Sequence, residues 1–366
     1  MQAKRPGVPI LDPHIHQWSP RTTPRTVTPA VKLFGWSAWL MRNLVPKLFP
    51  KASLEFVGKV DYVMGDYLPA DWGQDCAGFD VRGFVHVQAD WQGRGEHPAA
   101  GETAWLEQIG GEPLRAIVGE AELDDPKLGA LLDAHARASS RFVGIRDVLA
   151  FDPDRAVMDY DHRPDRCAEP AWRAGLAELG RRGLTYDVWL YGPQMRGLEA
   201  ALAAVFRDEP NTRVVLDHLG TPIGLGGPYG SHGTDAAARE HILGRWRDDL
   251  AALAVHEQLR AKISGLFMPI LGWGLHQREQ PPSVTEVVDR IGPLVEHALD
   301  CFGPERCMFA SNFPMDKVSL SWATLFEAFA QLVQTRSDAE RLDLFHDNAA
   351  RYYGLEPTGQ TAAVSD

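Results

Sequence analysis

The sequence has 366 residues, a formal net charge of −12 and 45% hydrophobic residues. Its length allows one large α/β domain or two ordinary domains. The acidic balance argues against a general nucleic-acid-binding protein, which needs a basic stripe to neutralise phosphates. No apolar run reaches the roughly 18 residues that span a bilayer, and no signal-peptide core follows the basic N-terminus. We therefore expect a cytoplasmic protein with neither a nucleic-acid nor a membrane partner.

The cysteines are too scattered to suggest a disulfide scaffold or a zinc knuckle, because no CxxC pair occurs. They are Cys76, Cys167, Cys301 and Cys307. We expect reduced thiols that are mostly buried.

From about residue 79 onward, short β-rich runs alternate with longer segments of helical period, which indicates parallel β/α units. The eight predicted strands are Pro9–Trp18, Val81–Ala89, Leu114–Ala121, Phe142–Leu149, Thr185–Leu190, Arg213–His218, Arg260–Gly265 and Cys307–Ser311. The predicted helices between them include Lys127–Ser139, Pro170–Arg182, Met195–Asp208, Ala236–His256 and Ser283–Cys301. This pattern predicts a (β/α)₈ TIM barrel in a single domain spanning residues 1–366.

A doubly wound sheet is the alternative fold, but no GxGxxG follows the first strand, where a dinucleotide fold would place its phosphate turn. Residues 19–69 exceed a normal loop and are rich in Trp, Leu and Pro. We predict a mostly helical insertion after the first strand, which serves as a lid or a subunit contact. A helix packed on the outside of the barrel is an equal alternative. A second long connection, Leu219–Asp235, is rich in Gly and Pro.

Three histidines are expected at the carboxyl ends of strands. These ends share one mouth of a barrel, so the histidines can come together there. His14 and His16 are two residues apart, so on a strand they face the same side, about 7 Å apart. Asp12 shares that parity and would orient a ligand from behind. His218 ends another strand, in "VVLDHLG". The three imidazoles predict a site for one divalent cation with an open position for water or substrate.

Seven motifs, in their order and spacing, resemble those of the amidohydrolase superfamily, and specifically its lactonase-like branch. They are "DPHIHQW", "FVGIRDVL", "TYDVWLYGPQM", "VVLDHLGTP", "AKISGL", "CMFASNFPMD" and "DNAARYYGL". The resemblance implies a (β/α)₈ hydrolase that uses water, often activated by a divalent metal such as Zn²⁺, to open lactones or related esters. Some similar proteins are instead metal-dependent decarboxylases.

Two positions depart from the metal-binding pattern of that family. Many members carry a histidine at the fifth strand, where this chain has the Tyr186–Trp189 run, and a carboxylate at the eighth, where it has Asn312. An amide cannot accept a proton from water near neutral pH. Asp316 and Asp187 are the candidate bases. Since some members of this branch hydrolyse reactive lactones without a metal, the histidines can also act as hydrogen-bond donors to the carbonyl.

Arg146 is predicted to bind a substrate carboxylate or hydroxyl, because its guanidinium donates two parallel hydrogen bonds. Asp147 would hold that guanidinium, and a purely structural Arg–Asp pair is an equal alternative. Lys262 would contact a substrate oxygen, or would be a core cation paired with Glu120 or Asp187.

Tyr191, Gln194 and Asn312 complete the predicted substrate-binding set. Tyr191 and Gln194 suit substrate hydroxyls, although loop residues of this kind can also cap the next helix.

The predicted reaction is hydrolysis of a small, oxygen-rich lactone. Water attacks the carbonyl, His14, His16 and His218 polarise the carbonyl or the water with or without Zn²⁺, and Asp316 or Asp187 receives the proton. The alternatives are a metal-dependent decarboxylase of an aromatic or unsaturated carboxylic acid and a barrel that binds without catalysis. The expected partner is a small-molecule substrate, and a homo-oligomer is an open alternative.

Overall fold

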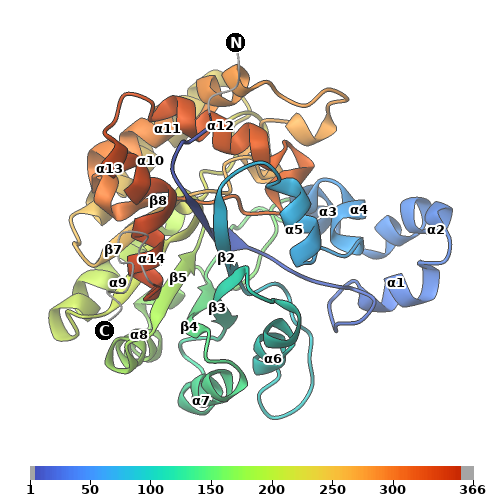
Figure 1. Ribbon diagram of the computed structural model, residues 1–366, viewed down its shortest axis with the longest axis horizontal. Coiled ribbons are helices and arrows are strands. Elements are labelled where there is room, and N and C mark those ends of the chain that lie inside the picture. Colours follow the sequence, from blue (N-terminus) through green and yellow to red (C-terminus); the bar gives the residue numbers. More distant parts are fainter. Residues whose placement is uncertain (1–4, 356–366) are drawn as a thin grey trace, which may run out of the picture.

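The computed structural model describes residues 5–355. Eight parallel strands pair in chain order, from β1 to β8. They are β1 (Ile10–Ile15), β2 (Val81–Val87), β3 (Leu114–Glu120), β4 (Phe142–Val148), β5 (Thr185–Trp189), β6 (Arg213–Leu216), β7 (Leu259–Ile263) and β8 (Cys307–Phe309). A parallel bridge from Ile15 to Phe313 links the first strand to the segment after the last. The predicted (β/α)₈ barrel is confirmed, and the doubly wound sheet is excluded (Figure 1).

Helices surround the strands and connect each to the next (Figure 1). They are α5 (Pro69–Asp75), α6 (Ala100–Ile109), α7 (Leu128–Ala138), α8 (Pro170–Arg182), α9 (Met195–Asp208), α10 (Ala236–Ala254), α11 (Val284–Phe302), α12 (Trp322–Leu332), α13 (Asp338–Leu342) and α14 (Asn348–Tyr353). The five helices predicted by range, α7 to α11, lie within two residues of their predicted bounds.

Several strands end earlier than predicted, and β6 shows why. It ends at Leu216, and the backbone then turns into the left-handed region, with φ of 56° at His218 and 49° at Leu219. A side-chain-bearing residue in that region cannot continue a strand. His16 likewise follows β1. These two histidines therefore lie just beyond the strands on which they were predicted.

The first strand contains a bulge that separates Asp12 from the histidines. Its pairing with β2 shifts register between Asp12 and Ile15, which resets the alternation of side chains. The Asp12 carboxylate accepts hydrogen bonds from Ser311 N at 3.0 Å and from Trp322 Nε1 of α12 at 2.9 Å. Asp12 therefore faces α12, and the prediction that it shares the face of His14 is wrong.

The inside of the barrel has an apolar floor beneath a polar mouth. Inward side chains such as Val118 and Val215 pack with residues of α14, including Tyr353. Two residues after Val118 and Val215, the inward positions are polar: Glu120 at the end of β3 and Asp217 just after β6. The closed lower end leaves the carboxyl ends of the strands as the place for a site.

The insertion predicted over residues 19–69 consists mostly of short helices. They are α1 (Thr28–Phe34), α2 (Ala38–Asn43), the 3₁₀ helix η1 (Val45–Leu48), α3 (Lys51–Val57) and α4 (Val60–Met64). The insertion has a small core of its own, which includes Val31, Met41 and Val45. In Figure 1, α1 and α2 lie farthest from the strands, whereas α5 lies beside them.

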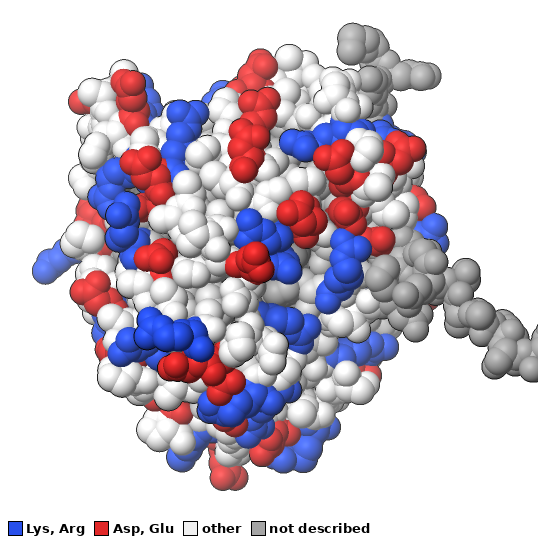
Figure 2. Space-filling view, turned by 90° about the vertical axis from the view of Figure 1, so that its left-hand side faces the viewer, with Lys and Arg blue, Asp and Glu red and all other residues white. Residues whose placement is uncertain are grey.

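Within residues 5–355, no helix is both long and apolar enough to cross a membrane. The face shown in Figure 2 intersperses basic and acidic side chains. All four cysteines are free; Cys301 is partly exposed and the other three are buried, as predicted. The assignment of residues 1–366 to one domain stays a prediction.

Candidate active site

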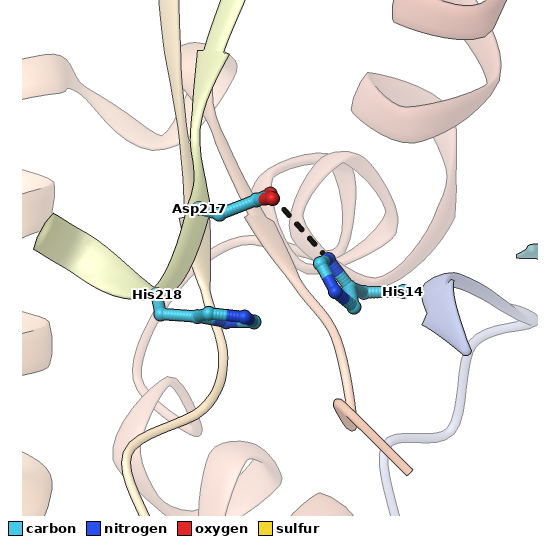
Figure 3. A group of neighbouring side chains, drawn as sticks. All are labelled: His14, Asp217 and His218. Atoms are coloured by element: carbon cyan, nitrogen blue, oxygen red, sulfur yellow. Dashed lines mark ion pairs between the residues drawn. The ribbon is translucent and has the colours of Figure 1, made fainter. Parts of the chain in front are cut away.

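Three histidines and an aspartate meet at the mouth of the barrel; Figure 3 shows His14, His218 and Asp217 of this group. The Nε2 atoms of His14 and His16 are 3.2 Å apart, and the rings of His14 and His218 have centroids 4.6 Å apart. His14 Nδ1 lies 3.4 Å from Asp217 Oδ1. All four side chains are buried. The structure therefore brings His14 next to both of the other predicted histidines, and adds Asp217, which the sequence analysis did not assign a role.

The position of His218 depends on an unusual backbone and on a glycine opposite. Its φ of 56° is uncommon for a residue with a side chain, and such conformations cluster at functional sites. Its Nδ1 lies 2.8 Å from Ser264 Oγ, just after β7. A Cβ at Gly265 would lie only 2.5 Å from the His218 ring, so only glycine leaves room for the imidazole.

Lys262 is a fully buried cation behind the histidines. Its Nζ lies 2.5 Å from Asp187 Oδ2, 3.2 Å from Asp217 Oδ1 and 3.1 Å from His14 Nδ1. The ammonium donates hydrogen bonds to Asp187 Oδ2 and His14 Nδ1, whereas its contact with Asp217 Oδ1 is an ion pair without a hydrogen bond. Asp187 Oδ2 also accepts a 2.8 Å hydrogen bond from the Tyr353 hydroxyl. Of the alternatives for Lys262, the structure shows the core cation paired with Asp187.

All three imidazoles are held in the neutral form. Burial lowers the pKa of His14, His16 and His218 well below the ordinary value, because the charged form loses its hydration. The positive charges of Lys262 and Arg146 lower the pKa of His14 and His16 respectively as well. A neutral imidazole offers a lone pair to a metal ion and an N–H to a carbonyl oxygen.

The two candidate bases have different surroundings. Asp316 accepts hydrogen bonds only from neutral donors, Asn312 Nδ2 at 3.1 Å and Phe267 N at 3.2 Å. Burial raises the pKa of Asp316 to about 8, so this carboxyl keeps its proton at neutral pH. Burial also raises the pKa of Asp187, but the Lys262 ammonium counteracts that rise. Asp187 is therefore the more strongly ionised of the two.

Arg146 points into the mouth, whereas its neighbour Asp147 points away. Arg146 Nη2 donates to Gln88 O at 2.7 Å, its Cζ lies 5.8 Å from the centre of the Trp189 ring, and its buried Nε has no hydrogen-bond partner among the described residues. Asp147 instead pairs with Arg166 at 2.7 Å. The predicted contact of Asp147 with Arg146 is wrong, because consecutive residues of a strand face opposite sides.

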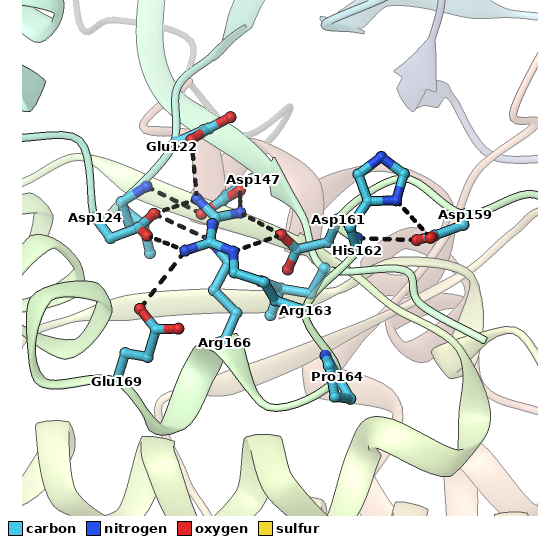
Figure 4. A network of polar contacts seen from close by, with 12 residues as sticks. Glu122, Asp124, Asp147, Asp159, Asp161, His162, Arg163, Pro164, Arg166 and Glu169 are labelled. Carbon is cyan, nitrogen blue, oxygen red and sulfur yellow. Dashed lines mark hydrogen bonds and ion pairs between the residues drawn. The ribbon is translucent and has the colours of Figure 1, made fainter. Parts of the chain in front are cut away.

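Figure 4 shows the network that Asp147 joins. Arg166 also pairs with Asp124 and lies 3.6 Å from Asp161. Arg163 contacts the same two carboxylates, Asp124 at 2.7 Å and Asp161 at 3.3 Å. The network fastens the long connection between β4 and α8 beside the mouth.

Tyr191 and Gln194 fasten the same connection from the other side. The Tyr191 hydroxyl donates to Met158 O at 2.7 Å. Gln194 Nε2 donates to Leu149 O at 2.6 Å, and its Oε1 accepts from Phe151 N at 3.0 Å. Because the loop takes up these polar atoms, the geometry favours a structural role for both residues over contact with substrate hydroxyls.

Aromatic side chains connect the insertion to the histidines of the mouth, with Trp189 at the centre. The Trp189 ring centroid lies 6.1 Å from His218, 5.0 Å from Tyr160 and 5.8 Å from Phe56 of α3. The insertion therefore reaches the mouth, as a lid would. Sequence reasoning missed Phe56, because nothing in the local pattern connects residue 56 with strands far along the chain; Trp189 and Asp217 carried a signal as strand-end residues.

The donor atoms at the mouth fit a divalent cation. One ligand atom each from His14, Asp217 and His218 lies within 4.8 Å of the others, a set of types that Zn²⁺ prefers. The 3.2 Å between the Nε2 atoms of His14 and His16 also suits two imidazoles on one ion. The Lys262 ammonium next to Asp217 opposes a second cation there, so we expect weak binding.

Comparison with known proteins agrees with this architecture. The chain matches the amidohydrolase family over residues 11–355. It is 33% identical to an uncharacterised protein, y4mH, of Sinorhizobium fredii, over 94% of this chain and 98% of that one. It is 30% identical to an L-fucono-1,5-lactonase of Burkholderia multivorans, over 69% of this chain and 77% of that one.

Among solved structures, a zinc-bound amidohydrolase from Burkholderia multivorans superposes with a TM-score of 0.66 at 23% identity, covering 95% of this chain and 99% of that one. This likeness concerns the fold. The family match over nearly the whole length confirms the predicted resemblance: the chain belongs to the amidohydrolase family and is a hydrolase-type enzyme.

Proposed function

We propose that this enzyme hydrolyses a lactone, with water attacking the ring carbonyl at the mouth of the barrel. The observation that carries the proposal is the convergence of His14, His16 and His218 with the guanidinium of Arg146. The relatives that bear the name L-fucono-1,5-lactonase, at 30% and 26% identity, support this chemistry.

The histidines would polarise the carbonyl or hold a divalent ion, for which we propose Zn²⁺. The predicted ligands are His14, His16 and His218, and Asp217 is a further candidate ligand, because its carboxylate lies within 4.8 Å of ligand atoms of His14 and His218. When bound, such an ion supplies Lewis-acid polarisation and a more acidic water.

His16 Nδ1 donates to Val87 O at 2.8 Å, which positions the ring and leaves the Nε2 lone pair 3.2 Å from Asn312 Oδ1. Without an ion, a neutral imidazole that carries its hydrogen on Nε2, as His14 does beside the Lys262 donor, would donate a hydrogen bond to the developing oxyanion.

Asp187 is a better candidate than Asp316 for the group that receives the proton released by the attacking water. Asp187, Asp217 and Lys262 sum to one net negative charge, and both Asp217 and Lys262 lie within 3.4 Å of His14 Nδ1. Because Lys262 faces His14 Nδ1 and lowers the pKa of His14, we propose that the proton from the attacking water passes to Asp187 and not to His14. Asp316 keeps its own proton at neutral pH and suits the opposite task, proton donation to the leaving alkoxide.

Arg146 would anchor a substrate carboxylate or hydroxyl through its unpartnered Nε. Lys262 is the positioning residue of the site, since its ammonium already faces protein acceptors. A small-molecule substrate, a cytoplasmic location and a homo-oligomer stay predictions.

A substitution at His218 tests the proposal. Asn tolerates the left-handed backbone there, so His218→Asn removes the imidazole without straining the turn. We expect kcat/KM on a lactone panel, followed with a pH indicator, to fall by about 100-fold or more. His241→Ala, on the exposed side of α10, is the matched control and should be unchanged.

Unchanged turnover in His218→Asn would contradict the assignment of His218. If the wild-type enzyme opens no lactone but releases CO₂ from aromatic or unsaturated acids, the reaction is the decarboxylation considered above. Elemental analysis of the purified enzyme, before and after a chelator, identifies the metal.

A further inference from the structure

The outer part of the insertion carries an unusual concentration of exposed apolar side chains. Leu33 is 63% exposed, Trp36 81%, Trp39 68% and Leu48 58%. Of the large hydrophobic residues exposed within the described chain, only Tyr160 and Val255 lie elsewhere. We define Leu33, Trp36, Trp39 and Leu48 as the outer patch. Solvent-exposed tryptophans gathered on one short segment indicate a contact surface.

The outer patch rests on an ordered base. Val31, Met41 and Val45 are turned inward into the small core of the insertion. Leu33, Trp39 and Leu48 lie on α1, α2 and η1, and Trp36 lies between α1 and α2. Because these helices already bury other apolar residues in the core of the insertion, the exposed ones are not side chains that failed to reach a core.

The charge of the insertion differs from that of the rest of the molecule. Residues 19–69 contain seven basic and three acidic residues, a net charge of +4 in a chain of net −12. Lys32 and Lys47 each precede a patch residue, both are exposed, and neither forms an ion pair with the described side chains. By contrast, the face in Figure 2, on the opposite side of the barrel, mixes both signs.

We propose that the outer patch docks on the surface of an anionic lipid bilayer. Tryptophan and leucine beside lysine are the residues that settle at a membrane interface, with the rings at headgroup depth and the ammonium groups on lipid phosphates. Short helices that lie on the bilayer suffice for this contact, which needs no spanning segment.

A second copy of the chain fits less well as the occupant. Two copies that meet at this segment would bring two net charges of +4 together, and like charges oppose association. The expectation of no membrane partner came from the lack of a spanning run, which does not bear on a peripheral contact.

Co-sedimentation with vesicles tests the proposal. We expect the full-length protein to bind phosphatidylcholine vesicles that contain phosphatidylserine, to bind pure phosphatidylcholine vesicles much less, and to dissociate as salt is raised. Trp36→Glu with Trp39→Glu should reduce the bound fraction about tenfold or more. Val255→Glu is the matched control, since Val255 is 70% exposed after α10 and far along the chain from the patch; it should bind as the native protein does.

Circular dichroism melts establish that each variant is folded, which is expected because the replaced side chains are exposed. No binding of the native protein to anionic vesicles overturns the proposal. So does equal binding by the double variant. An oligomer that the double variant alone dissociates, without vesicle binding, also overturns it and assigns the patch to a second copy.

Discussion

The barrel mouth and the outer patch break the usual distribution of residues in opposite ways. The mouth buries Lys262, Asp187 and Asp217, and the outer patch exposes Trp36 and Trp39. In the mouth, the buried charges are paired with one another, so their desolvation is partly offset. In the patch, nothing within the described chain covers the rings. Buried charged residues can be stabilised by contacts within the chain. Exposed apolar residues have no such contacts, so a cluster of them indicates a contact with another molecule.

The largest effect is expected from removing the cation at the centre of the mouth. Lys262→Met leaves two carboxylates and His14 without their shared partner, which should cost about 3–5 kcal/mol of unfolding free energy in urea titrations. Lys32→Met, on the exposed insertion, is the matched control and should change stability by less than about 0.5 kcal/mol. An equal loss of unfolding free energy in both variants would contradict the claim that the buried Lys262 is a stabilising partner and the exposed Lys32 is not.

A second test uses the protonated carboxyl of Asp316. Its pKa is raised to about 8, above the ordinary 3.8 of the unfolded chain, so the folded state binds the proton more tightly. The stability that this group contributes is full below the unfolded value and is lost as the pH rises through about 8. Asp316→Asn should therefore flatten the decline of unfolding free energy between about pH 4 and pH 8.

The matched control for that experiment is Asp208→Asn at the exposed end of α9, which should keep the native pH dependence. A decline in the Asp316 variant as steep as in the native protein would show that Asp316 is ionised in the folded state.

Phe56 is where the insertion contacts the barrel mouth. Phe56→Ala removes the contact of α3 with Trp189, so we expect faster hydrogen exchange in residues 51–57 and lower kcat/KM on the lactone panel by about tenfold. Leu48→Ala, in the same insertion but exposed, should alter neither. If exchange accelerates while kcat/KM stays constant, α3 covers the mouth without taking part in turnover.

The smallest effect is expected at a surface ion pair of the insertion. Lys51 lies 3.2 Å from Glu55 one turn along α3, and its side chain is 87% exposed. Lys51→Ala should change the unfolding free energy by less than about 0.5 kcal/mol in a urea titration. A larger loss would mean that this pair is part of a tighter contact than its exposure indicates.

The sequence predicted the barrel and the meeting of His14, His16 and His218, because strand and helix periods are local and a barrel gathers strand ends. It did not predict the direction of Asp12, because the predicted side-chain parity runs straight through Pro13, which lies where the register shifts. The partner of Asp147 was also missed, because Arg166 approaches from a loop that follows the strand. Phe56 needed the folded arrangement, whereas Asp217 was visible as a polar strand-end residue without an assigned role.

The closure of the barrel has a consequence for how the site forms. Asn312 N donates to His14 O at 3.0 Å and His16 N donates to Phe313 O at 2.8 Å, so the site lies on the seam between the first strand and the last. Contacts between residues nearly 300 positions apart close large loops, and such contacts form slowly. A growing chain therefore carries both histidines from the start of its synthesis, yet gains its active site only when its two ends have met.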